Sequence, residues 1–370
     1  MKKPINIALA IFLAVVAFLL WEFKPLPPAE FSPQGALPTN LPPFFASSFL
    51  PKVAKVAHAS TMTILPNGKL MAAWYAGERE GAKDVAIFTS ILEKSGWSTP
   101  QKLITRELVA GSVLAQVRKI GNPVLFTANG KVWLWFVSVG IGGWAASQIN
   151  VMQSEDGKKW SPPRRLVISP FFNISTLVRT RPVYLANNEI GLPISHESFM
   201  KFSEFLRLDE NGKILMKTRL PNPATLQPAI EIANAKTAHA FLRDYDENAA
   251  FYRVRHAITS DGGTTWQALA PTDIPNVNNS IATAKLPSGA WLLVGNDLKF
   301  RTSLNAWISN DFGKTWQLVR NLEKGDGEYS YPFLLVDAHG RIHLSYTWRR
   351  ETIRYMVFSQ AWLMAGDSKQ

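Results

Sequence analysis

The sequence predicts an all-β domain, a six-bladed β-propeller that follows an N-terminal hydrophobic segment. Polar turns, each between two apolar strands, recur along the domain at intervals of roughly 50 to 60 residues. The turns are centred on Gly68, Gly130, Asn188, Ala235, Gly289 and Gly340. One hairpin per blade gives six blades. No segment of the domain sustains a helical period over a long stretch, and only a short helical turn is expected, near 359–364.

The first 24 residues predict an export signal. Two lysines precede a run of apolar residues from Ile7 to Trp21, which is the charge arrangement of such a signal. No small-residue cleavage site follows, so the run favours an uncleaved signal anchor over a cleaved signal peptide. Residues 25–45 are rich in proline and are expected to form a stiff tether to a propeller at 46–365. We therefore expect an exported, membrane-anchored protein whose propeller lies outside the cytoplasm, in the periplasm or the extracellular space.

Composition and charge limit the chemistry of the chain. Its 370 residues carry a net charge of +12, which suits an anionic partner. The lysines and arginines are scattered through strand-like segments, so nucleic acid is not the expected partner. The chain has no cysteine, which excludes disulfides, thiolate metal sites and a cysteine nucleophile. The six histidines show no metal-binding spacing, and neither a metal nor a cofactor is predicted.

An eight-residue pattern, [S/T]-x-D-x-G-x-T-W, occurs at Thr259–Trp266 and again at Ser309–Trp316. The hydroxyl and carboxylate groups can bind backbone amides of a tight turn, the glycine permits positive φ, and the tryptophan can fill the gap between neighbouring sheets. A shortened copy spans Ser154–Trp160, and a more decayed copy ends at Trp97. The pattern resembles the Asp-box, or BNR repeat, of the sialidase (neuraminidase) superfamily. Asp-boxes stabilise hairpin turns, so chemistry must be sought elsewhere.

The resemblance covers roughly residues 50 to 360 and implies a set of site residues. Sialidases hold the substrate carboxylate with three arginines, attack with a tyrosine assisted by a glutamate, and protonate the leaving group with an aspartate. By position relative to the hairpin turns, Tyr331 matches the nucleophile, and Arg243 and Arg301 match two of the arginines. In the charged segment between the first strands, Asp84 matches the acid, and Arg79 is a candidate replacement for the third arginine.

Other positions depart from the sialidase pattern. His58 stands in the place of the first arginine, and Thr347 stands in the place of the glutamate that steadies it. Gln227 stands in the place of the assisting glutamate and cannot act as a base. Glu231 lies four residues further on and would face the same side of a regular strand, so it is a candidate substitute.

Further polar residues in apolar surroundings could bind substrate. Asn122, Gln227 and Asn296 are expected ahead of inner strands and could hydrogen-bond sugar hydroxyls, or could satisfy backbone groups instead. His196 and Glu197 form a polar pair in an apolar stretch of the third blade.

These residues favour an enzyme, a sialidase-like exo-glycosidase that acts on an anionic glycan of the sialic-acid type. Two alternatives stay open. His58, Tyr331 and the arginines also suit a uronate polysaccharide lyase on the same fold, in which an arginine neutralises the carboxylate and a histidine or tyrosine removes the adjacent proton. Gln227 in place of the base would also suit a propeller that binds glycans without cleaving them.

Overall fold

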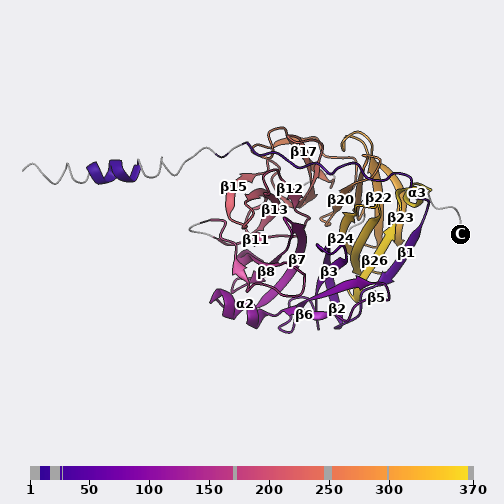
Figure 1. Cartoon of the computed structure of the whole chain (residues 1–370), viewed down its shortest axis with the longest axis horizontal. Coiled ribbons are helices and arrows are strands. Elements are labelled where there is room, and N and C mark those ends of the chain that lie inside the picture. The colour runs from indigo at the N-terminus through magenta and orange to yellow at the C-terminus, as the bar shows by residue number, and fades with distance from the viewer. Residues whose placement is uncertain are drawn as a thin grey trace, which may run out of the picture.

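The computed structural model describes residues 9–16, 26, 28–169, 173–245, 252–297 and 300–365. From residue 45 onward the chain forms six antiparallel sheets that follow one another around a central axis (Figure 1). The predicted six-bladed, all-β propeller is confirmed. Each of the six predicted turns joins the first two strands of a blade, because short polar turns fix hairpins locally.

The strands are given blade by blade, from the axis outward. The first blade contains β2 (Val56–Ile64), β3 (Leu70–Gly77), β4 (Ala86–Glu93), β5 (Gly96–Trp97) and β6 (Gln101–Ile104). The second contains β7 (Lys119–Ala128), β8 (Lys131–Val139), β9 (Ser147–Ser154) and β10 (Arg164–Arg165). The third contains β11 (Thr176–Leu177), β12 (Val183–Tyr184), β13 (Ile190–Glu197), β14 (Lys201–Leu208) and β15 (Ile214–Arg219).

The fourth blade contains β16 (Thr225–Ile232), β17 (Ala238–Asp244), β18 (Arg255–Thr259) and β19 (Gln267–Leu269). The fifth contains β20 (Ala282–Lys285), β21 (Trp291–Gly295), β22 (Ser303–Ser309) and β23 (Gln317–Lys324). The sixth contains β24 (Tyr329–Val336), β25 (Ile342–Trp348), β26 (Thr352–Phe358) and, as its outermost strand, β1 (Phe45–Phe49) from the N-terminal side. This pairing of β1 with β26 closes the ring.

The Asp-box copies lie between the third and fourth strands of their blades. In the copy at Thr259–Trp266, Thr265 N donates to the Asp261 carboxylate (2.9 Å). The Trp266 ring packs against Phe205 of the preceding blade, with ring centroids 5.9 Å apart. Trp316 packs in the same way against Phe241, at 5.3 Å. These tryptophans therefore fill the gap between neighbouring sheets, as the sequence pattern predicts.

Four innermost strands carry a β-bulge near their first residues. The bulge residues Ala59, Asn122, Gln227 and Tyr331 all have positive φ, between 46° and 54°. Register shifts mark the same places in β2, β7, β16 and β24. In three of the four the next residue is proline, which cannot donate a ladder hydrogen bond and is tolerated at a bulge. A bulge re-aims a side chain out of the strand's regular alternation, so these residues can point toward the axis.

The third blade differs from the others, because its innermost strand is split into β11 and β12, both paired with β13. The residues between the two short strands, 178–182, include Arg179 and Arg181. Arg179 lies outside the two short strands, and its side chain reaches across the axis.

Helices are few and peripheral. α2 (Arg106–Val113) connects the first two blades and was not predicted; Thr105 caps it by accepting a hydrogen bond from Leu108 N (3.2 Å). The predicted short turn is α3 (Gln360–Met364), capped by Ser359. Residues 9–16 of the predicted signal segment are helical. The rest of that segment lies outside the described residues, and among the helices that are described none has the length and apolarity to cross a membrane.

The proline-rich segment contacts the propeller. Phe31 is buried, and its backbone N donates to the carbonyl of Ala235 (2.7 Å). Further along, the Pro38 carbonyl lies against Gly340, where a side chain would collide with it. The segment thus follows one face of the propeller before it enters β1.

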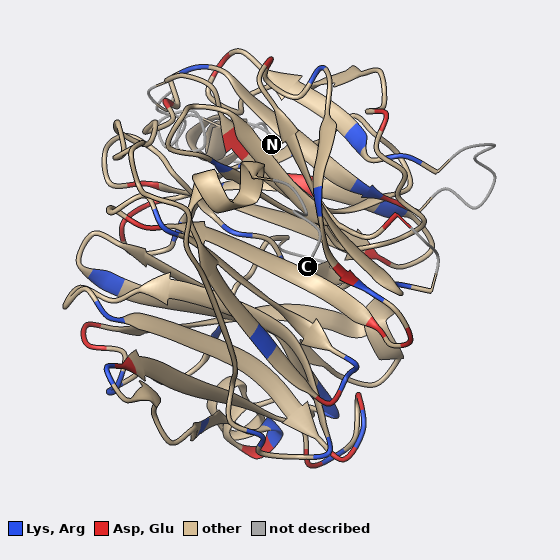
Figure 2. Ribbon diagram, turned by 90° about the vertical axis from the view of Figure 1, so that its right-hand side faces the viewer, with Lys and Arg blue, Asp and Glu red and all other residues tan. Residues whose placement is uncertain are grey.

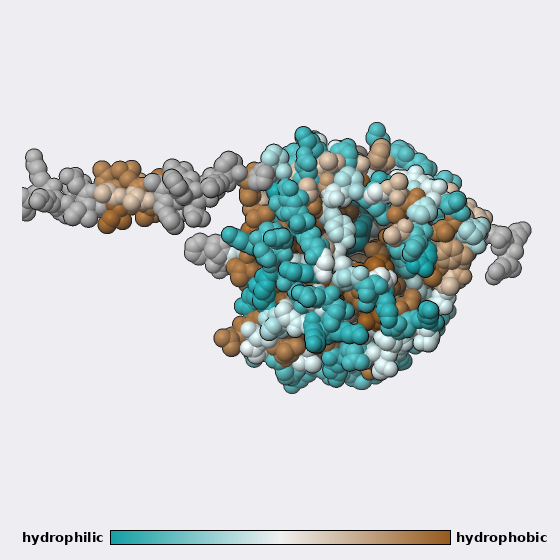
Figure 3. Space-filling view, viewed as in Figure 1, coloured by the Kyte–Doolittle hydropathy of each residue, from teal (hydrophilic) through white to brown (hydrophobic). Residues whose placement is uncertain are grey.

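The surface carries mixed charge. On the side seen in Figure 2, lysine and arginine are interspersed with aspartate and glutamate. The face seen in Figure 3 is mostly hydrophilic, with apolar atoms visible toward its centre.

Candidate functional site

A cavity of about 110 Å³ lies near the first residues of the innermost strands. Trp144 lines it together with seven polar residues, which are Glu80, Asn122, Ser195, Glu197, Gln227, Arg243 and Tyr331. Three of these residues, Asn122, Gln227 and Tyr331, occupy the bulges described above. The bulges of three different blades therefore direct their side chains into one cavity, which also contains Arg243 from β17.

Tyr331 is surrounded by cationic and aromatic groups. The guanidinium of Arg179 lies 5.3 Å from the centre of its ring, and that of Arg301 lies 5.4 Å from it. Arg243 hydrogen-bonds its phenol oxygen. The His58 ring packs edge-on against it, with ring centroids 4.5 Å apart. Four residues that sequence reasoning placed in the site, His58, Arg243, Arg301 and Tyr331, are thus brought together.

This environment lowers the pKa of Tyr331 below its ordinary value. Burial of the phenol acts in the opposite direction and would raise the pKa, but the positive charges of Arg243 and Arg301 and the hydrogen bond from Arg243 outweigh it. The phenol is consequently more easily ionised than a free tyrosine, which makes it a better nucleophile or base.

His58 and Thr347, which stand where the sequence resemblance leads one to expect an arginine and a glutamate, contact each other. Thr347 Oγ1 lies 2.9 Å from His58 Nδ1 and accepts a hydrogen bond from Ala59 N (3.1 Å). Burial of His58, together with the nearby Arg350 charge, holds its pKa well below the ordinary value. His58 is therefore a neutral imidazole at neutral pH.

A chain of ion pairs runs beside the cavity, between the sixth and first blades. Glu328 binds Arg301 Nη1 (3.0 Å) and Arg350 Nε (2.5 Å), and Arg350 also pairs with Glu80 (2.5 Å). Burial would raise the pKa of Glu328, but hydrogen bonds from Arg350 and Ser330 lower it to about 2. Arg350 was not predicted; it lies in the hairpin between β25 and β26, which no sequence pattern links to the site.

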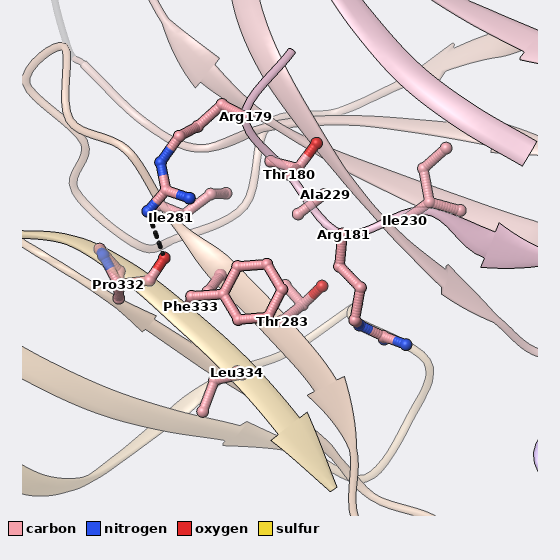
Figure 4. A pocket seen from close by; sticks show the side chains of 11 residues that line it. Arg179, Thr180, Arg181, Ala229, Ile230, Ile281, Thr283, Pro332, Phe333 and Leu334 are labelled. Carbon is pink, nitrogen blue, oxygen red and sulfur yellow. Dashed lines mark hydrogen bonds between the residues drawn. The ribbon is translucent and has the colours of Figure 1, made fainter. Parts of the chain in front are cut away.

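Arg179 was also missed, and it crosses the axis beneath the cavity. Its guanidinium donates to the carbonyls of Ser60 (3.2 Å), Tyr331 (2.6 Å) and Pro332 (3.2 Å). Figure 4 shows the bond to Pro332. Burial lowers the pKa of Arg179 to about 10, so the group stays cationic at neutral pH. A signal was present in the sequence, since Arg179 and Arg181 precede Pro182 in an otherwise apolar inner segment.

Glu197 ends β13 and lines the cavity from the third blade. Its backbone N donates to Ser175 Oγ (2.7 Å), which fixes the end of the strand. Burial raises the pKa of its carboxyl group, partly offset by Arg243 and Lys201. The sequence marked the pair His196 and Glu197 only as polar residues in an apolar stretch. His196 instead pairs with Glu204 (2.8 Å).

Five residues predicted for the site do not line this cavity. Two of them, His58 and Arg301, lie against the Tyr331 ring without being part of the wall. Asp84 is exposed and accepts a hydrogen bond from Glu78 N (2.8 Å), which ties it into its own loop. Arg79 is exposed in the same loop, and its neighbour Glu80 is the residue that reaches the cavity. Asn296 is buried, and its amide donates to the carbonyls of Ser303 and Tyr329. Asn296 thus takes the backbone-satisfying alternative that the sequence left open.

Glu231 lies in a different cavity, of about 350 Å³, lined by the last residues of the innermost strands. It pairs there with Arg181 (3.2 Å). Glu231 therefore does not substitute for a base beside Gln227, for two reasons. The bulge after Leu226 breaks the alternation of the strand, and four residues of strand span roughly 13 Å.

Gln227 is buried, and its side-chain oxygen has no hydrogen-bond partner among the described residues. A ligand hydroxyl in the cavity could supply one. In the part of the chain that the structure describes, no three histidine, aspartate or glutamate side chains gather as a metal site.

Comparison with known proteins agrees with the fold. A model of the BNR repeat-like domain family matches residues 68–344. No curated protein matches the chain.

Solved structures show the same architecture at low sequence identity. The Hadza microbial sialidase Hz136 is 16% identical, with a TM-score of 0.67 over 82% of this chain and 66% of its own, just under two thirds of its length. A protein of unknown function from Dyadobacter fermentans is 14% identical, with a TM-score of 0.68 over 85% of this chain and 97% of its own. The intramolecular trans-sialidase of Ruminococcus gnavus is 15% identical, with a TM-score of 0.65 over 86% and 97%. At these identities the likeness establishes the fold and leaves the activity to the site.

Proposed function

The chain belongs to the BNR repeat-like domain family, and we propose that it is a sialidase-like exo-glycosidase that cleaves an anionic glycan of the sialic-acid type. One observation carries the proposal. Tyr331 lines a cavity, its pKa is lowered, and guanidinium groups from three different blades surround its ring and hydroxyl. Such an arrangement suits both the binding of a carboxylate and attack by a phenolate.

The residues divide into roles as follows. Arg243 and Arg301 hold the substrate carboxylate by charge-assisted hydrogen bonds, since both have a guanidinium next to Tyr331. The Tyr331 oxygen attacks the anomeric carbon. Asn122 and Gln227 lie on the same wall and bind sugar hydroxyls, and the unpartnered oxygen of Gln227 supports this role.

A second candidate is elimination by a uronate lyase, which one observation favours. The neutral imidazole of His58 lies against Tyr331 beside several arginines. A neutral imidazole or an ionised phenol can remove a proton from the carbon next to a carboxylate that an arginine neutralises. Hydrolysis is placed first because Tyr331 lines the cavity, whereas His58 is buried behind it.

The test is turnover of the propeller on a fluorogenic sialoside, with Tyr331→Phe as the comparison variant. The proposal expects release of the fluorophore by the wild type and a loss of at least roughly 100-fold in kcat for the variant, because only the attacking oxygen is removed. Full activity of Tyr331→Phe would reject the nucleophile. Absence of release by the wild type, with an unsaturated product from a uronate polymer, would replace hydrolysis by elimination. Binding of glycans with no product from either substrate would favour a non-catalytic propeller.

The apolar run from Ile7 to Trp21 supports the further proposal that the propeller is exported and held at a membrane. Fractionation of cells tests this, and recovery of the full chain in the cytoplasmic fraction would reject it.

A further inference from the structure

The proposed hydrolysis needs a group that protonates the leaving oxygen, and the two carboxyl groups in the cavity wall differ in how free they are. Glu80 is engaged on both oxygens: one accepts from the Tyr75 hydroxyl (3.3 Å), and the other pairs with Arg350 (2.5 Å). No hydrogen bond from the described part of the chain reaches the carboxyl oxygens of Glu197. Glu197 is therefore the carboxyl group of this wall that can give up or take a proton without breaking an ion pair.

Glu197 and Glu80 also differ in where they lie relative to Tyr331. Tyr331 belongs to the sixth blade, and Glu197 belongs to the third, which is the opposite blade of a six-membered ring. Glu80 follows β3 in the first blade, next to the sixth. In a displacement at carbon the leaving group departs on the side opposite the nucleophile, so the acid must face the nucleophile across the substrate.

We propose that Glu197 is the general acid of this site and donates its proton to the glycosidic oxygen as Tyr331 attacks from the opposite blade. The inference rests on the proposed hydrolysis. The Tyr331 phenolate forms a bond to the anomeric carbon, the bond from that carbon to the glycosidic oxygen breaks, and this oxygen takes the proton of Glu197. Water then attacks the same carbon, gives a proton to the Glu197 carboxylate, and releases the phenolate. Burial of Glu197, which favours its protonated form, agrees with this role.

The experiment compares two sialosides that need an acid to different degrees. The nitrophenolate of 4-nitrophenyl sialoside leaves without protonation, whereas the sugar alkoxide of sialyl-lactose does not. For Glu197→Gln we expect a loss of roughly 100-fold or more in kcat/KM on sialyl-lactose and a much smaller loss in kcat/KM on the nitrophenyl substrate, because kcat/KM reports the step in which the leaving group departs and not the later attack of water. Glu231→Gln is the matched control, because it removes another buried carboxylate that lies in the far cavity.

The outcomes separate this inference from the proposed function. Equal losses of kcat/KM on the two substrates in Glu197→Gln would overturn the acid role. A loss of kcat/KM that is larger on sialyl-lactose in Glu80→Gln, and not in Glu197→Gln, would also overturn it. A leaving-group dependence in Glu231→Gln would also overturn it, because that effect could not come from contact with the substrate. A wild-type protein that cleaves neither sialoside would overturn the proposed function, and the role of Glu197 with it.

Discussion

His58 and Thr347 show how single residues can change a site together. The sequence identifies them as two separate departures from the sialidase pattern, 289 positions apart, and the structure places them 2.9 Å from each other. A charged pair is thereby replaced by a neutral, hydrogen-bonded pair, and no buried charge is left without a partner. Arg243 and Arg301 beside Tyr331 keep the pocket cationic without an arginine at position 58.

Another pair of residues makes stability depend on pH. His239 and His256 are buried in the fourth blade, with His239 Nδ1 2.8 Å from His256 Nε2. Burial lowers the pKa of His239 to about 4, and burial together with His239 lowers that of His256 to about 3. The unfolded chain has the ordinary value of 6.5, so between these values the unfolded state binds more protons than the folded state. The stability contributed by the neutral pair is present above pH 6.5 and is lost as the pH falls.

We therefore expect the free energy of unfolding to fall by roughly 2–3 kcal/mol per histidine between pH 6.5 and 4.5. Urea unfolding at several pH values measures this, and the double variant His239→Gln/His256→Gln should reduce the dependence. His339→Gln, at an exposed turn, is the control and should not change it. An unchanged slope in the double variant would contradict the assignment.

At the scale of elements, Arg179 ties the bulges of two blades together. Its guanidinium binds the carbonyl of Ser60 in β2 and those of Tyr331 and Pro332 in β24. A bulge leaves backbone groups without ladder partners, and here a side chain from a third blade satisfies them. The split of the innermost strand of the third blade makes this reach possible.

Replacement of Arg179 by methionine should lower the free energy of unfolding by about 3 kcal/mol, since it leaves buried carbonyls unsatisfied. Thermal and urea unfolding measure this change. Arg164→Met is the control, because among the residues that the structure describes the Arg164 side chain has one hydrogen bond, to the Asn211 carbonyl (3.0 Å), at the outer edge of a blade. It should cost less than about 1 kcal/mol. Equal losses in the two variants would show that Arg179 does not act through the bulges.

Elements also explain which parts of the site the sequence could predict. Hairpin turns are local, so their spacing predicts the number of blades, and residues near the first turn of each blade, such as Tyr331 and Arg243, could be placed. The bulges are not visible in the strand pattern, and they change which side chains share a face. The expectation that Glu231 could take the place of a base at Gln227 is wrong, because the two residues line different cavities. The sequence also could not show that Glu80, and not Asp84, reaches the cavity. Both lie in the loop at 78–85, and the path of a loop does not follow from the order of its residues.

At the scale of the whole molecule, the ring is closed by a strand from the far end of the chain. β1 pairs with β26 over five residues, from Phe45 opposite Phe358 to Phe49 opposite Arg354. The Phe45 ring stacks on Trp362, with centroids 4.5 Å apart. Contacts between residues some 300 positions apart cannot be derived from local sequence. Here they mean that one strand of the sixth blade precedes the first blade in the chain.

A chain that starts at residue 25 should therefore unfold at the same temperature as the full chain, whereas one that starts at Leu50 should unfold at a Tm lower by roughly 5–10 °C. The shorter chain loses β1 and also the buried Phe31, and both losses expose apolar surface of the blades. Because β24 of the same sheet carries Tyr331, turnover should fall together with Tm in the shorter chain. Thermal unfolding and sialoside turnover of both chains measure this. An equal Tm for the two would mean that the contacts between neighbouring blades hold the ring closed without β1.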